Sequence, residues 1–204
     1  MSSATPELPA EQQAERDIVD RSLLRAIAQQ DRPAFEKLYR DYHRRLGRFL
    51  ARVTQRDDLI EEVVNDTFWI VWRKAEEFRG QSLVSTWIMG IAYRCALKAL
   101  RRAGPPPLAD PVLPIEDETQ WDDPLVQQDR RSWIMQGLER LPPDQRTTLL
   151  LAYYLGHSCE EISEIMACPV GTVKARMFHA RIRLRNLLPT LGGMNDGAAY
   201  EVHR

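Results

Sequence analysis

The fold is decided by residues 156–188, which read GHSCEEISEIMACPVGTVKARMFHARIRLRNLL. This stretch predicts two short helices joined by a tight turn. Ser158 and Glu161 have the spacing of a capping box, in which the Ser hydroxyl and the Glu carboxylate each accept from a backbone amide of the first turn. Pro169 suits the opening of the second helix, because a residue there needs no amide hydrogen bond. The stretch is therefore predicted to be a helix-turn-helix.

The second helix of this motif, 170–188, has two different faces. The apolar residues at three- and four-residue spacing, predicted to face a core, are Val173, Met177, Ala180, Leu184 and Leu187. The basic residues mainly off that stripe are Lys174, Arg176, His179, Arg181, Arg183 and Arg185. No Asp or Glu occurs in this range. An acid-free cationic helix at this place favours a reader of the DNA major groove. The alternative is an ordinary amphipathic surface helix, although such helices usually mix charge signs.

Composition and charge leave DNA binding open. The chain has 204 residues, enough for one large or two small domains, and 44% hydrophobic and 28% charged residues are ordinary for a soluble protein. The formal net charge of −1 argues against nucleic acid, but the charges are segregated. Residues 104–129 contain seven acids and no Lys or Arg, whereas 170–188 is the opposite case. The local patch, not the sum, decides DNA binding.

Cysteine and hydropathy patterns indicate a soluble cytoplasmic protein. Three cysteines at these spacings suggest no disulfide framework, which fits a reducing compartment. Zinc held by His157, Cys159, Cys168 and His179 is conceivable, but there is no C-x-x-C pair, and both cysteines fit as small apolar residues. We predict no metal and no cofactor. No run of about 18 apolar residues occurs, so we expect no membrane insertion.

The remaining patterns predict an all-α fold of two small helical domains joined by an extended, acidic, Pro-rich linker. Helical periodicity marks helices near 16–30, 33–53, 59–78 and 83–102, with Asp31 as a plausible cap between the first two. Six prolines in 104–129 favour the linker. The predicted organisation is a disordered tail (1–15), a helical domain (16–103), the linker (104–129), the helix-turn-helix domain (130–188) and a flexible tail (189–204).

The order of these pieces resembles one family, the bacterial sigma factors of the sigma-70 type. The N-terminal motifs that resemble its second conserved region are NDTFWIVW (65–72), FRGQS (78–82) and STWI (85–88). The motifs that resemble its fourth region are LPPDQR (141–146), EEISEI (160–165) and CPVGTVKAR (168–176). With only these two regions and a linker, the chain resembles the extracytoplasmic-function (ECF) group. The match covers roughly residues 30–103 and 130–188.

The resemblance implies that the helix over 61–72 docks on the coiled coil of the largest subunit of core RNA polymerase. The candidate docking residues are Asp58, Glu61, Glu62, Asn65, Asp66, Phe68 and Trp72. Acidic and amide side chains beside an apolar stripe suit a polar docking face. The alternative interpretation of the same residues is a solvated helix face.

The resemblance also implies that the loop 79–84 and the following helix capture the minus-ten promoter element as a single strand. Melting requires bases to leave the stack and find stacking surfaces and phosphate partners. The candidates are Arg79, Gln81, Ser82, Trp87, Arg94, Lys98, Arg101 and Arg102. Trp87 stands where related factors use a strand-separating aromatic, but it also falls on the apolar stripe, so a core role stays open. Many members have Asn at position 94 and an acid at 98, so stronger phosphate attraction with altered base selection is our hypothesis.

The helix-turn-helix is implied to read the minus-thirty-five element as duplex. The candidates are Lys174, Arg176, Phe178, His179, Arg181 and Arg183, with the first two as base readers and the two later arginines as phosphate contacts. In the family the linker threads the RNA path of the polymerase, where its acids imitate nucleic acid. A solubilising spacer is the alternative.

The predicted function is that of an alternative sigma factor, which binds core RNA polymerase, recognises both promoter elements and promotes melting. We expect a monomer that binds promoter DNA and is held inactive by an anti-sigma factor. The alternative is a free-standing helix-turn-helix regulator, which binds duplex DNA without polymerase. The sequence contains no Gly-rich phosphate loop, metal-ligand cluster or nucleophile motif, so we do not expect an enzyme.

Overall fold

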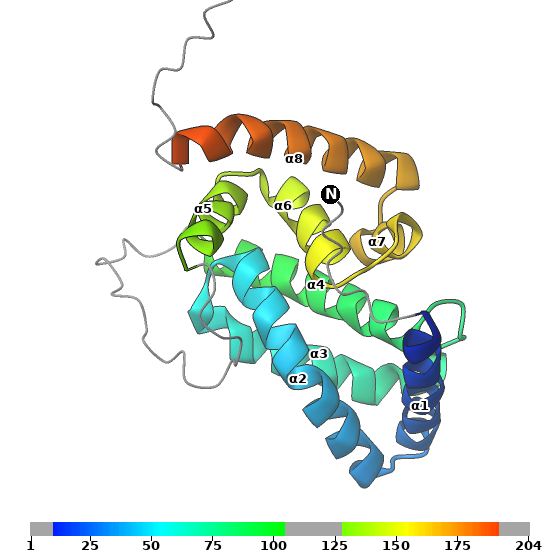
Figure 1. The fold of residues 1–204 in the computed structure, drawn as a ribbon. Coiled ribbons are helices and arrows are strands. Elements are labelled where there is room, and N and C mark those ends of the chain that lie inside the picture. The colour runs from blue at the N-terminus through cyan, green and yellow to red at the C-terminus, as the bar shows by residue number, and fades with distance from the viewer. Residues whose placement is uncertain (1–9, 105–127, 192–204) are drawn as a thin grey trace, which may run out of the picture.

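The computed structural model describes residues 10–104 and 128–191 (Figure 1). In these ranges the chain is helical and has no strand, which confirms the all-α class. The N-terminal elements are α1 (Ala10–Ala28), α2 (Arg32–Thr54), η1 (Asp57–Leu59), α3 (Ile60–Lys74), η2 (Ala75–Glu77) and α4 (Val84–Ala103). The C-terminal elements are α5 (Gln128–Glu139), α6 (Pro143–Leu149), η3 (Leu150–Tyr154), α7 (Cys159–Met166) and α8 (Val170–Leu191). No helix in these ranges is both long and apolar enough to cross a membrane.

Local sequence explains where the N-terminal helices begin and end. Asp31 caps α2, since its Oδ1 accepts from the backbone N of Ala34 at 3.0 Å, and this confirms the predicted helix boundary. The helix ends at Gln55, which takes a left-handed conformation and donates its N–H to the carbonyl of Ala51. The first helix begins at Ala10. The predicted tail over 1–15 is therefore wrong for its last six residues, where a polar Glu/Gln-rich sequence of good helix formers extends α1.

The core of the N-terminal unit is built from large apolar side chains of α1, α2, α3 and α4. The fully buried ones include Leu24, Ile27, Leu38, Tyr42, Leu46, Phe49, Leu50, Phe68, Ile88 and Met89. One polar pair is buried with them, because the Tyr42 hydroxyl donates to Oδ2 of Asp20 at 2.5 Å. Burial raises the pKa of Asp20, against the opposing effect of the Tyr42 hydrogen bond.

The C-terminal unit contains the predicted helix-turn-helix. Ser158 and Glu161 form the capping box of α7, with Ser158 Oγ accepting from the Glu161 amide at 3.2 Å and a Glu161 carboxylate oxygen accepting from the Ser158 amide at 2.9 Å. Before it, the chain widens into the π-helical turn η3 and reverses at Gly156, where φ is +71°. The turn between α7 and α8 uses Ala167 at φ +50°. The last helix extends to Leu191, three residues beyond the predicted end.

The two units pack against each other through α4 and α7 (Figure 1). One continuous buried cluster includes Ile88 and Met89 of α4 together with Ile162, Ile165 and Met166 of α7. A second, smaller cluster within the C-terminal unit consists of Leu141, Leu149 and Ala180. Residues 105–127, most of the predicted linker, lie outside the described residues, as do 192–204 of the predicted tail. The rest of the linker is Gly104, after α4, and residues 128–129, which begin α5.

Four apolar side chains that the helical spacing of the sequence predicts to face the core are exposed instead. They are Ile18 at 68%, Leu97 at 37%, Ile134 at 51% and Tyr153 at 46% relative exposure. For Leu97 the reason is geometric: α7 has eight residues and covers α4 near Thr86 and Gly90, whereas Leu97 lies about two turns further along. Periodicity marks a face of a helix, but the length of the neighbour decides how much of that face is covered.

Candidate nucleic-acid interface

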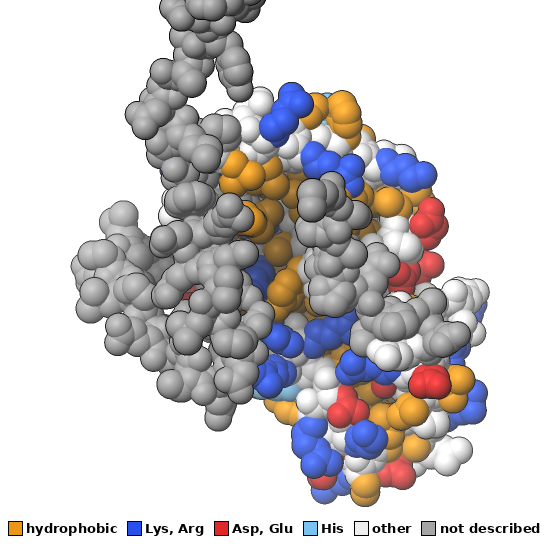
Figure 2. Space-filling model, in the orientation of Figure 1, with side chains coloured by type: hydrophobic (Ala, Val, Ile, Leu, Met, Phe, Trp, Pro, Cys, Tyr) orange, Lys and Arg blue, Asp and Glu red, His pale blue; other side chains and the backbone are white. Residues whose placement is uncertain are grey.

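The last helix, α8, presents a cationic surface. Val173 and Ala180 are fully buried and fix the helix on the rest of the C-terminal unit. The candidate side chains that are exposed around this anchored stripe are Lys174, Phe178, His179, Arg181 and Arg183. Phe178 is 60% exposed and lies against His179, with 5.5 Å between ring centroids. Lys and Arg side chains gather over α8 in Figure 2, whereas acidic side chains appear next to it, over α7. The structure thus places these candidates on one solvent-facing helix.

Two of the α8 arginines are held by other side chains. The Nη2 atom of Arg176 lies 2.5 Å from Oδ2 of Asp144, in the first turn of α6, and its Nη1 donates to the Cys168 sulfur at 3.4 Å. Arg181 donates to the hydroxyl of Tyr153 and lies 5.5 Å above that ring. Asp144 and Tyr153 were not predicted as partners, because they precede Arg176 and Arg181 by 32 and 28 residues. These contacts give both guanidinium groups a defined orientation.

On α4, three of the candidate cations form a continuous row. Arg94, Lys98 and Arg101 are exposed and follow one another at four- and three-residue spacing, so they share a helix face. Arg102 turns away and forms an ion pair with Glu62 of α3. The predicted phosphate track therefore has three exposed cations in a row on α4. Its fourth member, Arg102, connects α4 to α3 through the ion pair with Glu62.

The loop before α4 presents Arg79 and Gln81 to solvent, whereas Ser82 is half-buried. Trp87, one turn into α4, is half-buried and packs on Phe78 with 5.4 Å between ring centroids. Phe78 and Trp87 thus pack on each other beneath the loop. Trp87 is partly exposed while it packs on Phe78.

The candidate docking residues on α3 are divided between surface and core. Glu61, Glu62, Asn65 and Asp66 are exposed, and so is Asp58, which forms an ion pair with Arg56 at 2.7 Å. Trp72 is half-buried against Phe35, with 5.1 Å between ring centroids. Phe68 is a correction: it is 2% exposed and packs on Phe35 and Tyr39, because the position falls in the middle of the apolar stripe.

Sequence reasoning missed the most exposed aromatic side chain of α3. Trp69 is 60% exposed, and the guanidinium of Arg73 lies 6.0 Å from the centre of its ring. It stands four residues after Asn65 and three after Asp66, so it extends their exposed face. An exposed Trp off the apolar stripe was the available signal.

A polar contact joins α4 to the helix-turn-helix. The Thr86 hydroxyl, 2% exposed as a residue, donates to Oε1 of Glu161 at 2.8 Å. Burial by itself raises the pKa of Glu161, but the neighbouring His157 imidazole, the Ser158 amide and the Thr86 hydroxyl outweigh it and lower that pKa to about 2. The Nδ1 atom of His157 lies 3.6 Å from Oε1, beyond hydrogen-bond length. Glu161 is therefore held as a carboxylate.

An open hollow of about 490 Å³ lies between α1, the loop before α4, and α7. It is lined by Gln13, Ala14, Arg21, Gln81, Ser82, Leu83, Glu160, Glu161 and Glu164. The loop candidates Gln81 and Ser82 thus share one space with three carboxylates of α7. Among the described residues, no three His, Cys, Asp or Glu side chains gather as metal ligands.

Comparisons with known proteins place this arrangement in a family. The family described as Sigma-70 region 2 matches residues 38–105, and Sigma-70 region 4 matches 131–184. The "ECF RNA polymerase sigma-E factor" of Haemophilus influenzae is 31% identical over 186 residues, which cover 85% of this chain and 97% of that protein. "ECF RNA polymerase sigma factor SigM" of Mycobacterium tuberculosis is 35% identical over 179 residues, 87% of each chain.

Solved structures agree with this result. The sigma factor RpoE of Bartonella quintana, in complex with the anti-sigma factor NepR, is 25% identical with a TM-score of 0.58, over 76% of this chain and 96% of that one. CnrH, in complex with the cytosolic domain of CnrY, is 20% identical with a TM-score of 0.62, over 84% and 98%. The fold and surfaces define a two-unit helical DNA-binding protein. The chain belongs to the sigma-70 family, with regions 2 and 4, and within it to the ECF sigma factors, which are transcription initiation factors.

Proposed function

We propose that this sigma factor divides its work between three surfaces. The exposed face of α3 binds core RNA polymerase, the loop 79–83 with the α4 row takes the minus-ten strand, and α8 reads the minus-thirty-five duplex. The observation that carries the proposal is the placement of cationic side chains. They line α4 and α8 in a chain of net charge −1, within the two segments that match the family.

For the polymerase surface, Trp69 supports the assignment. Exposed Trp is among the residues that dominate protein interfaces, particularly when polar groups surround it. Glu62, Asn65 and Asp66 supply these groups on the same helix. Phe68, the buried member of the original set, supports the helix from beneath.

For the minus-thirty-five surface, the orientation of Arg176 supports a base-reading role. A guanidinium that is already held by Asp144 and the Cys168 sulfur loses less side-chain freedom when it meets a guanine edge. Two arginines further along the helix are the proposed phosphate contacts. Arg181 lies over the Tyr153 ring, and Arg183 is exposed.

We further propose that the protein acts in the cytoplasm as a monomer, binds an anti-sigma factor, and leaves catalysis to the polymerase. Two solved structures support a protein partner, because RpoE of Bartonella quintana is in complex with an anti-sigma factor and CnrH is in complex with the cytosolic domain of CnrY.

Run-off transcription tests the proposal directly. Purified bacterial core polymerase is supplied with genomic fragments, with and without this protein. We expect discrete new transcripts that require the protein, and their start sites give the promoter sequence. Absence of transcripts together with tight duplex binding by the protein alone would contradict the proposal and identify the chain as a free-standing regulator.

A further inference from the structure

We propose that Asp17 and Arg21 of α1 are positioning residues, which hold the loop 79–83 in the shape that receives the minus-ten strand. Neither residue touches DNA in this proposal; both act through the loop. They lie outside the segments 38–105 and 131–184 that match the family. The inference rests on the proposed function, which it deepens by extending the minus-ten reader from α4 and the loop to a second helix, α1.

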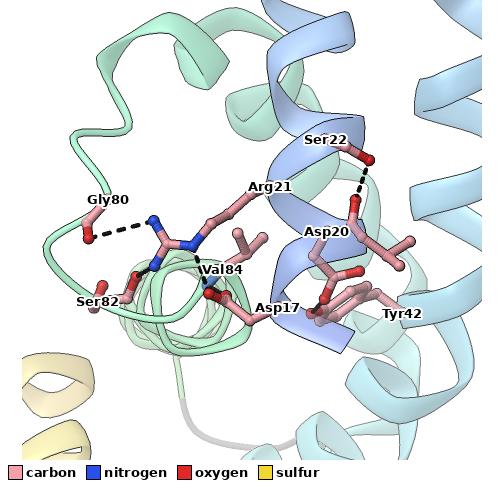
Figure 3. Close-up of polar contacts among 9 residues, drawn as sticks. Asp17, Asp20, Arg21, Ser22, Tyr42, Gly80, Ser82 and Val84 are labelled. Carbon is pink, nitrogen blue, oxygen red and sulfur yellow. Dashed lines mark hydrogen bonds and ion pairs between the residues drawn. The ribbon is translucent and has the colours of Figure 1, made fainter. Parts of the chain in front are cut away.

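Arg21 binds the loop on both sides of Gln81 (Figure 3). Its Nη2 donates to the carbonyl of Ser82 at 2.9 Å, and its Nη1 donates to the carbonyl of Gly80 at 3.4 Å. The planar guanidinium is a rigid fork, so two carbonyls fixed to it are also fixed relative to each other. The exposed side chain of Gln81 therefore projects from a short segment whose backbone is tied on either side.

Asp17 holds Arg21 and also the start of α4. One carboxylate oxygen, Oδ2, lies 2.5 Å from Nε of Arg21, and the other, Oδ1, accepts from the backbone N of Val84 at 2.8 Å. The first amides of a helix need acceptors, which the residue just before the helix usually supplies. Here that residue is Leu83, which has no side-chain acceptor. A carboxylate from α1 takes its place, 67 residues earlier in the chain.

The loop conformation depends on this close approach. Gly80 has a φ of +71°, and a Cβ at this position would lie 2.6 Å from Nη1 of Arg21. Only glycine therefore admits the guanidinium without a shift. The same guanidinium lies 5.5 Å from the centre of the Phe78 ring, which packs on Trp87. Three features together determine where Gln81 and Ser82 point: the backbone at Gly80, the packed pair of Phe78 and Trp87, and Arg21 of α1.

A loop that is already ordered binds a flexible strand with a smaller loss of conformational entropy. A single strand loses conformational freedom on binding, and a loop that is ordered beforehand adds little to that loss. Removal of Arg21 is expected to loosen the loop, and to weaken selection at the base that meets Gln81 and Ser82. Reading of the minus-thirty-five duplex, which depends on α8, is expected to stay unchanged.

The test uses full-length protein with core polymerase on a promoter library randomised in the minus-ten element, with the minus-thirty-five element held constant. Arg21→Gln is expected to reduce discrimination at one or two minus-ten positions by about tenfold, the factor for loss of one charge-assisted hydrogen bond. Arg21→Lys keeps the positive charge beside Asp17 but not the planar fork. Its base discrimination is therefore expected to lie between that of wild type and that of Arg21→Gln. Arg25→Gln, an exposed arginine on the same helix, is the matched control and is expected to behave like wild type.

A second measurement follows the loop without DNA. Hydrogen exchange of the Val84 amide is expected to be about tenfold faster in Asp17→Ala, because the carboxylate that accepts from it is removed. Asp17→Asn keeps an oxygen acceptor and is expected to exchange more slowly than Asp17→Ala. Thermal unfolding of each variant separates loosening of the loop from loss of the whole fold.

The outcomes are distinguishable. Wild-type protein that directs no promoter-specific transcription overturns the proposed function and this inference with it. Wild-type transcription combined with unaltered base discrimination in Arg21→Gln overturns the positioning role alone. A uniform loss of transcription from all library members, equal in Arg21→Gln and Arg21→Lys and matched by reduced thermal stability, overturns it as well, because that pattern indicates a structural role only.

Discussion

The two helical units of this protein obtain their cores in different ways. The N-terminal unit buries many large side chains among its own helices, including Tyr42, Phe49 and Phe68. The C-terminal unit has a buried cluster of its own that comprises only Leu141, Leu149 and Ala180. Its other buried residues, such as Ile162 and Ile165, belong to the cluster that continues into α4. The helix-turn-helix thus keeps α8 exposed by sharing the core of its neighbour.

The largest effect that would test this comparison is expected at Phe68. Truncation of a buried Phe to Ala costs about 3–5 kcal/mol, so Phe68→Ala should lower the free energy of unfolding by that amount in urea titrations. Trp69→Ala, at the next residue, is the matched control. Because Trp69 is 60% exposed, its stability should change by less than about 0.5 kcal/mol, whereas its affinity for core polymerase should fall. Equal losses of stability in the two variants would contradict the division between core and surface on α3.

The next effect concerns Glu161, where the two units meet. Its pKa is about 2 in the folded protein against an ordinary value of 4.5, so protonation favours the unfolded chain. Its contribution, about 3 kcal/mol as an upper limit, is complete above pH 4.5 and is lost as the pH falls towards 2. Glu161→Gln keeps a capping-box side chain but removes the charge. We expect its stability to depend less on pH between 4.5 and 2.5 than that of wild type or of Glu164→Gln, measured by urea unfolding.

A smaller effect should separate base reading from phosphate contact within α8. Arg176→Ala is expected to lose roughly 1–3 kcal/mol of discrimination at one minus-thirty-five base pair. Arg183→Ala should weaken binding to all duplexes alike. Binding of the polymerase complex to a set of single-base promoter variants measures both. A uniform loss in Arg176→Ala would demote that residue to a phosphate anchor.

The smallest effect is expected on the α4 row. Arg94→Asn removes one exposed positive charge, so the slope of log affinity against log salt should decrease by about one. We also expect its minus-ten preference to change, because a cation stands where the family resemblance noted in the sequence implies Asn. Arg25→Gln serves as the control, and unchanged salt dependence and promoter preference in Arg94→Asn would refute the hypothesis.

Local sequence patterns predicted the elements but not the contacts between them. The capping box at Ser158, the cap at Asp31 and the exposed cations of α8 depend on neighbours within a few residues, and the structure contains each of them. The Arg21 contacts with Gly80 and Ser82 span about 60 residues, and no periodicity records them. Phe68 was misassigned because a resemblance names a helix, whereas its burial depends on the aromatic rings of α2.

The contact between α4 and α7 also has a consequence for length. A 20-residue helix such as α4 is about 30 Å long, and the two packed units form one body on that scale. The minus-ten and minus-thirty-five elements are separated by roughly 25 base pairs, or about 85 Å of duplex. A body of about 30 Å cannot reach across about 85 Å, so simultaneous contact of the proposed surfaces with both elements requires α7 to leave α4.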